Sequence, residues 1–195
     1  MHFSAYQTGP GCAVGVIKDG QLIFSKGYGY ANLDYDVPIT DYSKFYIGSM
    51  ARQFCGAALL KLESEGKVNF QDPITRYLPD FPVYEEEITI DHIIHHTSGI
   101  RGTSSMQLIA GIDHNFEEHF TANRQYEMIK AQKALNFSPG TEYRYSSGGY
   151  IVLAKLVEAV SGKSFRKYLD EYFFQPLGMK NTFIIDDHNE IVKDR

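Results

Sequence analysis

The chain has 195 residues, 43% of them hydrophobic and 22% charged, which is a length typical of one domain and a composition typical of globular proteins. These proportions exclude a disordered chain, a collagen-like chain and a coiled coil, and the longest apolar runs fall well short of the roughly 18 residues that span a membrane. The 19 basic and 24 acidic side chains leave a net charge of −5, so we expect neither a nucleic-acid partner nor a membrane span.

Two strands joined by a tight turn are the first predicted elements. Residues Cys12–Lys18 and Gln21–Tyr28 have the composition of strands. Asp19-Gly20 between them is typical of a type I′ hairpin, because that turn needs a positive φ at both central positions. Beyond Tyr30 the alternation fades, and we expect a polar connection that contains Pro38.

Helices are predicted for the rest of the chain. In chain order we expect a helix from Ser49 ended by Gly66, a short turn after Asp72-Pro73, a short helix capped by Thr89, helix in the second half of 103–136, a helix ended by Gly162, and one capped by Ser164 that stops before Pro176. Neither a repeat nor a linker is evident. We therefore predict one domain over 1–195, with a strand hairpin at 10–30 and a mainly helical part at 45–182 that carries the candidate active site.

Ser49 and Arg52 are the first candidates for chemistry. A serine at a helix N-terminus lies near unpaired backbone N–H groups and the positive end of the helix dipole. Residues three apart share a helix face, so Arg52 can approach the Ser49 hydroxyl. Spacing alone requires no more than an N-cap serine followed by a surface arginine, and the surrounding segments decide between the two interpretations.

Several short segments are weak signals one by one, but their occurrence together and in this order is informative. They are 45–54 (FYIGSMARQF), 95–100 (HHTSGI), 145–150 (YSSGGY), 161–164 (SGKS) and 176–179 (PLGM). In this order they resemble the serine β-lactamase and penicillin-binding protein family, most of all its class C and esterase branch. The resemblance runs from about Pro10 to Thr182, nearly the whole chain.

The resemblance implies both a fold and a reaction. The fold is α+β and β-lactamase/transpeptidase-like, an antiparallel sheet packed with helices plus an all-helical region. The reaction is acyl transfer, in which Ser49 attacks the carbonyl of a small ester, β-lactam or D-alanyl peptide and water then clears the acyl-enzyme. Tyr145 matches a family tyrosine that takes part in general-base catalysis, and Ser147 falls in the substrate-binding position two residues later.

Arg52 departs from the family pattern, which has a lysine three residues after the serine. Arginine keeps its proton in proteins and offers no acceptor, so Arg52 cannot be the general base. It can place a fixed positive charge near Ser49 and Tyr145, which favours the tyrosinate form. We therefore expect Ser49 as nucleophile, Tyr145 as base, Arg52 as electrostatic support and reduced activity.

Two further departures concern Ser147 and the end of the chain. Ser147 stands where the family has an asparagine, and a hydroxyl reaches less far than an amide. Family members continue beyond Arg195 with strands that supply one oxyanion-hole N–H, so we expect a C-terminally incomplete fold and a loss on the order of 10²–10³ in rate. An open sheet edge would favour association of copies into a homo-oligomer.

Two other functions compete with a serine hydrolase. One is a catalytically inactive relative or fragment that binds a ligand or partner, which Arg52 and the absent strands favour. The other is a metal site, since His92, His95 and His96 follow Asp91 at suitable spacing. Because the chain has no HExxH arrangement there and the resemblance accounts for this stretch, we expect neither a metal nor a cofactor.

Three remaining features have plain interpretations. Ser164 and Lys167 form a literal SxxK, but they open an ordinary amphipathic helix, so we expect a cap rather than a nucleophile. Cys12 and Cys55 are expected to be buried apolar thiols rather than a disulfide. Residues 1–11 have neither a cationic start nor an apolar core, so we expect no export signal in them; the compartment stays open, since members of this family are often exported.

Overall fold

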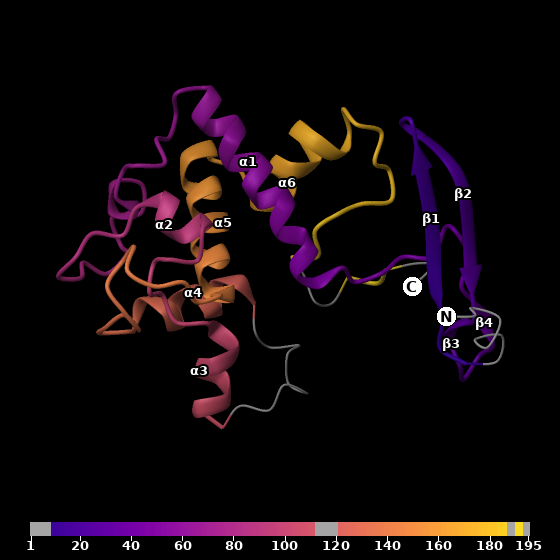
Figure 1. Cartoon of the computed structure of the whole chain (residues 1–195), viewed down its shortest axis with the longest axis horizontal. Helices are drawn as coiled ribbons and strands as arrows, with labels where there is room; N and C mark the ends of the chain where they lie inside the picture. The colour runs from indigo at the N-terminus through magenta and orange to yellow at the C-terminus, as the bar shows by residue number, and fades with distance from the viewer. Residues whose placement is uncertain (1–8, 112–120, 187–189, 193–195) are drawn as a thin grey trace. The chain divides into compact units, whose positions relative to one another are not determined.

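The computed structural model describes residues 9–111, 121–186 and 190–192 (Figure 1). Within these residues the chain divides into two compact units. One unit holds the residues up to Ile47 together with 190–192, and the other begins at Gly48. The boundary therefore falls just before the candidate nucleophile, and the single domain over 1–195 stays a prediction.

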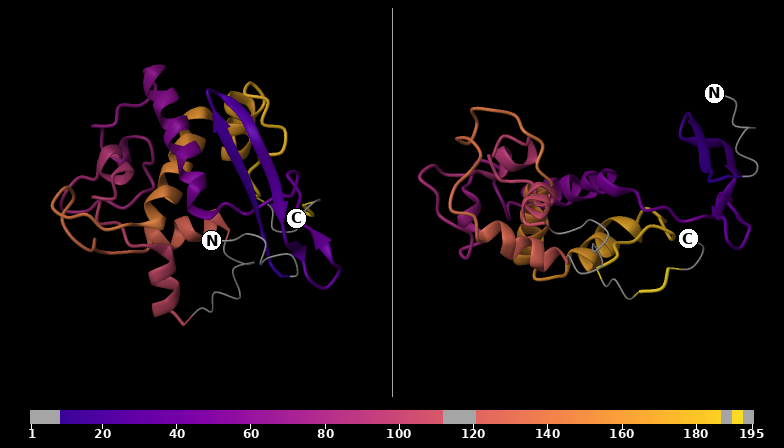
Figure 2. Two further views of the ribbon diagram at one scale, coloured as in Figure 1. Left: turned by 45° about the vertical axis from the view of Figure 1, so that its right-hand side comes forward. Right: turned by 90° about the horizontal axis from the view of Figure 1, so that it is seen from below.

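An antiparallel ribbon opens the first unit, as the sequence predicts. β1 (Cys12–Lys18) pairs with β2 (Gln21–Tyr28), and the two strands lie side by side in every view (Figure 2). Asp19 and Gly20 have φ angles of 50° and 74°, the left-handed pair that a type I′ turn requires. The register shifts once near the middle of the ribbon, which is typical of a β-bulge.

A second, shorter ribbon follows where the sequence predicts only a polar connection. β3 (Tyr30–Asn32) pairs antiparallel with β4 (Val37–Pro38). The Asn32 side-chain oxygen accepts the backbone N–H of Asp34 at 2.9 Å and so helps to close the turn between them. The prediction was wrong here because strands of three and two residues are too short to show alternation, and a proline argues against a strand.

Helices are the main regular structure of the second unit, and turns and loops connect them in its described residues. Its α-helices are α1 (Arg52–Ser64), α2 (Ile90–Ile94), α3 (Thr103–Ile109), α4 (Ala122–Lys130), α5 (Ser147–Ser161) and α6 (Phe165–Leu169). Short 3-10 helices at Gly48–Ala51 and Ile74–Arg76 and a π turn at Asp170–Phe174 accompany them. The α+β class that the sequence predicts is thus confirmed.

The two ends of α1 compare differently with the prediction. Its C-terminal end is confirmed, since Gly66 has a φ of 68° and donates its N–H to the carbonyl of Glu63 at 2.8 Å. Lys67 donates to the carbonyl of Leu62 at 2.9 Å, which completes a Schellman motif. The start lies three residues later than predicted, because Ser49 belongs to the 3-10 helix that leads into α1.

α3 is a helix that the sequence analysis missed in the first half of 103–136. Its residues TSSMQLI include one threonine and two serines, which are weak helix formers. Burial of Thr103, Met106 and Gln107 against the rest of the unit supports the helix instead. Tertiary packing has overridden local propensity at this point, while α4, in the second half, confirms the prediction.

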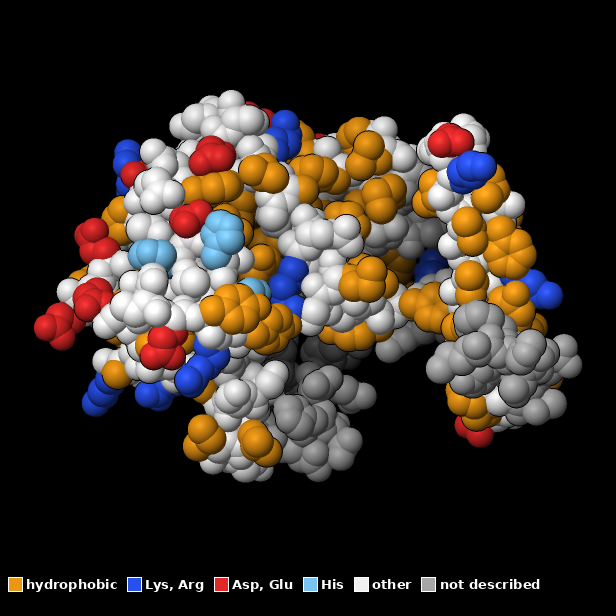
Figure 3. Space-filling model, viewed as in Figure 1, with side chains coloured by type: hydrophobic (Ala, Val, Ile, Leu, Met, Phe, Trp, Pro, Cys, Tyr) orange, Lys and Arg blue, Asp and Glu red, His pale blue; other side chains and the backbone are white. Residues whose placement is uncertain are grey.

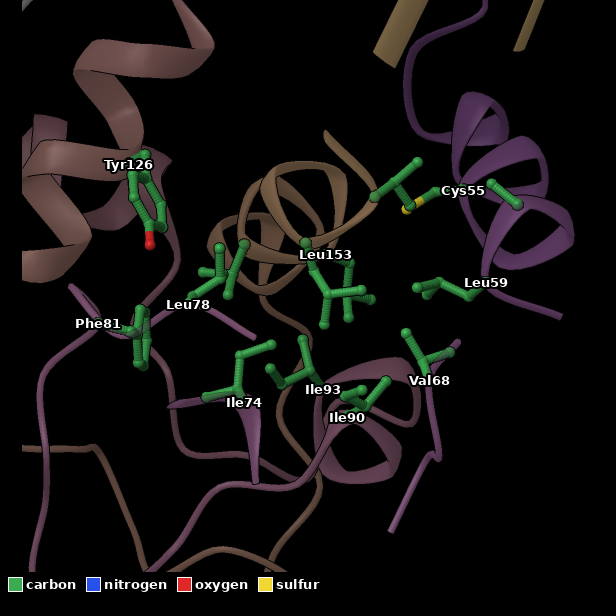
Figure 4. Close-up of a cluster of buried hydrophobic side chains, with 14 of the residues drawn as sticks. Cys55, Leu59, Val68, Ile74, Leu78, Phe81, Ile90, Ile93, Tyr126 and Leu153 are labelled. Carbon is green, nitrogen blue, oxygen red and sulfur yellow. The ribbon is translucent and has the colours of Figure 1, made fainter. Parts of the chain in front are cut away.

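The hydrophobic core of the helical unit is built around α5, which contacts α1, α2, α4 and α6. Figure 4 shows how Leu153 of α5 lies between Leu59 of α1 and Ile93 of α2. The fully or nearly fully buried members of this cluster include Leu59, Leu62, Ile74, Ile90, Ile93, Ile129, Leu153, Leu156 and Leu169. This packing fixes the N-terminal end of α5 relative to that of α1, and candidate site residues lie at each of these two ends.

The hairpin unit buries far less. Its only buried hydrophobic side chain among the described residues is Ile39. Ile17, Leu22 and Ile23 are 73%, 63% and 60% exposed, and hydrophobic side chains follow the hairpin in the space-filling view (Figure 3). Among the helices that the structure describes, none has the length and apolar character that crossing a membrane requires.

Candidate active site

Ser49 and Tyr145 meet although 96 residues separate them in sequence. The Ser49 Oγ and the Tyr145 hydroxyl oxygen lie 2.9 Å apart, a hydrogen bond in which either hydroxyl can donate. Ser49 is exposed on the 3-10 turn before α1, and Tyr145 is 52% exposed just before α5. Two hydroxyls that can exchange a proton are therefore in direct contact at the surface.

Arg52 completes a cluster of three with them. Its guanidinium carbon lies 4.7 Å from the ring centre of Tyr145 and 5.4 Å from that of Tyr150, so the cation packs over two aromatic rings. The Arg52 Nε is buried and has no hydrogen-bond partner in the described part of the chain. The arginine thus supplies a permanent positive charge beside the Ser49–Tyr145 pair and no proton acceptor.

The start of α5 explains the position of Tyr145. Ser146 is buried, and its hydroxyl accepts the backbone N–H of Gly149 at 3.1 Å, which caps the helix. A Cβ on Gly148 would lie 2.6 Å from the carbonyl oxygen of Arg101, so only glycine lets α5 approach this closely. The cap at Ser146 and the close approach at Gly148 together fix the start of α5 and, with it, the adjacent Tyr145.

Ser147 lies on the first turn of α5, beside but not within the cluster of three. Its Oγ is 3.1 Å from the Oγ1 of Thr103, a buried residue at the start of α3. The two hydroxyls form a half-buried polar pair, which the sequence analysis did not foresee for Thr103. No motif marked Thr103, because its partner comes from 44 residues further along the chain.

Residues 2–194 match the family model that is described as Beta-lactamase. The chain belongs to the β-lactamase family. The D-aminopeptidase of Brucella anthropi is 32% identical over 179 residues, which cover 92% of this chain and 34% of that protein. Protein flp of Staphylococcus aureus is 31% identical over 181 residues, which cover 89% of this chain and 34% of its own length. The chain thus spans about a third of the length of these curated relatives.

Solved structures agree with this membership. The octameric penicillin-binding protein homologue from Pyrococcus abyssi superposes with a TM-score of 0.78 at 28% identity, covering 91% of this chain and 41% of that one. The β-lactamase/transpeptidase-like fold that the sequence predicts is confirmed, as is the resemblance to the serine β-lactamase and penicillin-binding protein family. That Arg52 and Ser147 stand at the positions of the family's lysine and asparagine stays a prediction from the sequence.

His96 is a functional candidate that sequence reasoning missed as part of this site. Its Nδ1 accepts the backbone N–H of Ser146 at 3.2 Å, and its ring centre lies 4.8 Å from that of Tyr145. Burial, and to a smaller extent the positive charge of Arg52, lower the pKa of His96 below its ordinary value of 6.5. The HTSG segment was the available signal, but it gives no role to His96, and the spacing of the histidines suggests only a metal site.

The other histidines near this segment are used separately. The Nδ1 of His92 accepts the backbone N–H of Thr89 at 3.3 Å, whereas His95 lies 3.2 Å from a carboxylate oxygen of Asp91. In the described ranges, no group of three histidine, cysteine, aspartate or glutamate side chains is placed to hold a metal ion.

Ser164 and Cys55 have structural roles. The Ser164 hydroxyl accepts the backbone N–H of Lys167 at 3.2 Å, so this serine caps α6 as expected. Cys55 is a free, buried thiol one turn along α1 from Arg52, and burial raises the pKa of its thiol to about 12. Both cysteines are free, but only Cys55 is buried as predicted, because Cys12 lies on the hairpin unit, which buries little, and is partly exposed.

Proposed function

We propose that the chain is a serine hydrolase that forms an acyl-enzyme on Ser49, with Tyr145 as general base and Arg52 as electrostatic support. The observation that carries the proposal is the 2.9 Å contact between the Ser49 Oγ and the Tyr145 hydroxyl. A base within hydrogen-bond reach of the nucleophile is the geometric requirement for this chemistry.

The reaction follows from that contact. Tyr145, as tyrosinate, takes the proton of Ser49 while the Oγ bonds to the substrate carbonyl carbon. Collapse of the tetrahedral intermediate expels the leaving group, which takes the proton from Tyr145, and leaves an acyl ester on Ser49. Water then attacks that ester with Tyr145 again as base, which restores the free hydroxyl.

Arg52 limits the rate in this proposal. Its positive charge, 4.7 Å from the Tyr145 ring centre, stabilises the negative charge on the phenolate oxygen. It cannot itself relay a proton, whereas a lysine in that place can. We therefore propose turnover well below that of family members with a lysine at this position.

The substrate class we propose is a small ester, β-lactam or D-alanyl peptide. Membership in the β-lactamase family supports acyl transfer, and the relative named D-aminopeptidase supports a substrate with a D-amino acid. The exposure of Ser49 and Tyr145 is consistent with access for a small molecule from solvent.

The test is intact mass spectrometry after incubation with benzylpenicillin and with p-nitrophenyl acetate. We expect an adduct of the acyl mass that disappears in Ser49→Ala and persists in Ser104→Ala, a matched change of an exposed serine on α3. An adduct that persists in Ser49→Ala, or none at millimolar reagent on a chain shown to be folded by circular dichroism, would contradict the proposal.

A relative or fragment that binds a ligand or partner without turnover is the second candidate. The permanently charged Arg52, with its buried and unpartnered Nε, favours it. In that case the reagents leave no adduct, while benzylpenicillin still protects the chain against thermal unfolding because it binds only the folded state.

Association of copies through the hairpin is a further part of the proposal. In the ribbon of β1 and β2 each strand pairs with one neighbour within the described residues, which leaves open edges. The Pyrococcus abyssi homologue is octameric, which supports the idea of self-association. Light scattering across concentration tests it, and a monomer at every concentration would contradict it.

A further inference from the structure

We propose that His96, as a neutral imidazole, is a positioning residue that holds the segment around Tyr145 so that its hydroxyl stays against Ser49. The inference deepens the proposed function and rests on it. His96 contacts Tyr145 and the residues on either side of it, and it acts through Tyr145.

His96 accepts two hydrogen bonds, one from each of the residues that flank Tyr145. The backbone N–H of Arg144 donates to the His96 carbonyl at 3.0 Å, and that of Ser146 donates to the His96 Nδ1 at 3.2 Å. One residue therefore binds the N–H groups immediately before and after the candidate base. These two hydrogen bonds restrict the backbone of Tyr145 on both sides.

The imidazole ring also forms a wall against which Tyr145 packs. The His96 ring centre lies 4.8 Å from that of Tyr145 and 5.3 Å from that of Tyr150. Tyr150 is itself anchored, because its hydroxyl donates to the carbonyl of Ile94 at 3.1 Å. Tyr143 meets the His96 ring edge-on, with ring centres 6.0 Å apart.

The backbone of His96 adopts a conformation that this arrangement requires. Its φ is 59°, in the left-handed region that few residues other than glycine, asparagine, aspartate and histidine visit. Its own N–H donates to the carbonyl of Ile93 at 3.2 Å, which ties it to α2. The strained conformation turns both the His96 carbonyl and the His96 ring toward the same short segment.

The protonation state of His96 decides whether the second hydrogen bond exists. An Nδ1 that accepts an N–H must carry a lone pair, so the ring is neutral with its proton on Nε2. Protonation would place a second N–H opposite that of Ser146 and a positive charge beside Arg52. Burial and Arg52 already lower the pKa of His96, so the neutral form prevails at neutral pH.

The groups that face His96 leave few alternative sources of a pH effect. They are the constant charge of Arg52 from α1, the phenols of Tyr143, Tyr145 and Tyr150, and the neighbouring imidazole of His95. Arg52 keeps its proton, and proton loss from Tyr145 affects the wild type and the variants at position 96 alike. His95 is the remaining group, and it is exposed and paired with Asp91, so it provides the control.

The experiment measures the acylation rate by p-nitrophenyl acetate between pH 5 and 8 in the full chain and three variants. In the wild type we expect the rate to fall more steeply below pH 6.5 than the proton equilibrium of Tyr145 alone requires, because His96 also gains a proton and releases Ser146. His96→Gly keeps the backbone conformation but removes the acceptor, so we expect a loss of about tenfold even at pH 7.5.

His96→Asn supplies the conservative rescue. Asparagine tolerates a positive φ, and its amide oxygen can accept the Ser146 N–H without titrating. We expect most of the rate at pH 7.5 to return, and the ratio of the wild-type rate to the His96→Asn rate to fall between pH 6.5 and 5. His95→Asn should keep the wild-type profile. A ratio of wild-type to His96→Asn rates that does not change with pH, or the same change in the ratio for His95→Asn, would overturn the inference.

A second readout keeps this test separate from that of the proposed function. The amide resonance of Ser146 is followed by nuclear magnetic resonance as the pH changes, together with the ring resonances of His96. We expect both to titrate together below pH 6.5 even if the chain acylates nothing, in which case only the proposed function fails. If the Ser146 amide resonance does not shift while the ring resonances of His96 titrate, the positioning role is wrong.

Discussion

The N-terminal ends of α1 and α5 carry the two halves of the candidate site, and the chain holds them by different means. Before α5, Ser146 caps the helix with its side chain, is 2% exposed, and is bound by His96. Before α1, the 3-10 turn Gly48–Ala51 has no buried residue, and no side-chain hydrogen bond caps the helix at Ala51. The tyrosine side thus has a buried residue and a side-chain cap, whereas the serine side has neither and meets Tyr145 through the 2.9 Å contact of Ser49.

This difference indicates where change is tolerated. Substitutions at the start of α5 disturb backbone packing and stability together with the position of Tyr145. Substitutions at the start of α1 act on the exposed side chains and leave the core intact. Four changes test that division, in order from the largest expected effect to the smallest.

Tyr145→Phe should lower the acylation rate of Ser49 by about 10²–10³-fold, because it removes the proposed base while the ring still packs against His96 and Arg52. Stopped-flow or mass-resolved acylation kinetics measure it. Tyr143→Phe, a matched change at an exposed tyrosine two residues earlier, should leave the rate within about twofold. Equal effects of both changes would show that Tyr145 has no special part.

Gly148→Ala should destabilise the helical unit by about 1–3 kcal/mol. Its new Cβ would lie 2.6 Å from the carbonyl oxygen of Arg101 and 3.2 Å from Ile129, so α5 has to shift. Urea unfolding followed by circular dichroism measures the change. If stability is unchanged, the start of α5 is less tightly held than the packing of Gly148 indicates.

Arg52→Lys should raise the acylation rate by about tenfold, because an amine can accept a proton where a guanidinium cannot. The same change loses the packing of the guanidinium over Tyr145 and Tyr150, so stability should fall slightly. The rate is measured at several pH values above 7, where more of the amine is neutral. A rate that stays the same or falls would mean that Arg52 is not the counterpart of the family's lysine.

Gly56→Ala should stabilise the helical unit by about 0.5–1 kcal/mol, the smallest effect of the four. Gly56 lies inside α1, and a Cβ there would meet nothing within 4 Å. It is the matched control for Gly148→Ala, since the two glycines sit on the two helices of the site. Destabilisation by Gly56→Ala, seen in the same urea titration, would remove the contrast between α1 and α5.

Much of the fold was predictable because local signals are strong where it is regular. The hairpin was predictable from Asp19-Gly20 and the end of α1 from Gly66, since each turn demands a positive φ that few sequences satisfy. The ribbon of β3 and β4 was missed because its strands are too short to show a repeating pattern. α3 was missed because burial, which a single sequence does not display, outweighs its weak propensity.

The candidate site divides in the same way. Ser49, Arg52 and Tyr145 were predictable from motifs, and the structure brings all three together. His96 and Thr103 were not, because their roles depend on contacts with residues 50 and 44 positions away. Every residue except proline has a backbone N–H, so the amino-acid type does not show which N–H groups a distant side chain binds. The hydrogen bond from Ser146 to His96 therefore could not be predicted from the sequence.

The buried thiol of Cys55 gives this site a built-in reporter. Because burial raises the pKa of the thiol to about 12, it stays protonated and inaccessible at neutral pH while the helical unit is closed. Cys12, which is half-exposed and belongs to the other unit, offers a faster-reacting reference in the same molecule. The delay between the two in a thiol-labelling time course therefore measures how often the packing around α1 opens near Arg52.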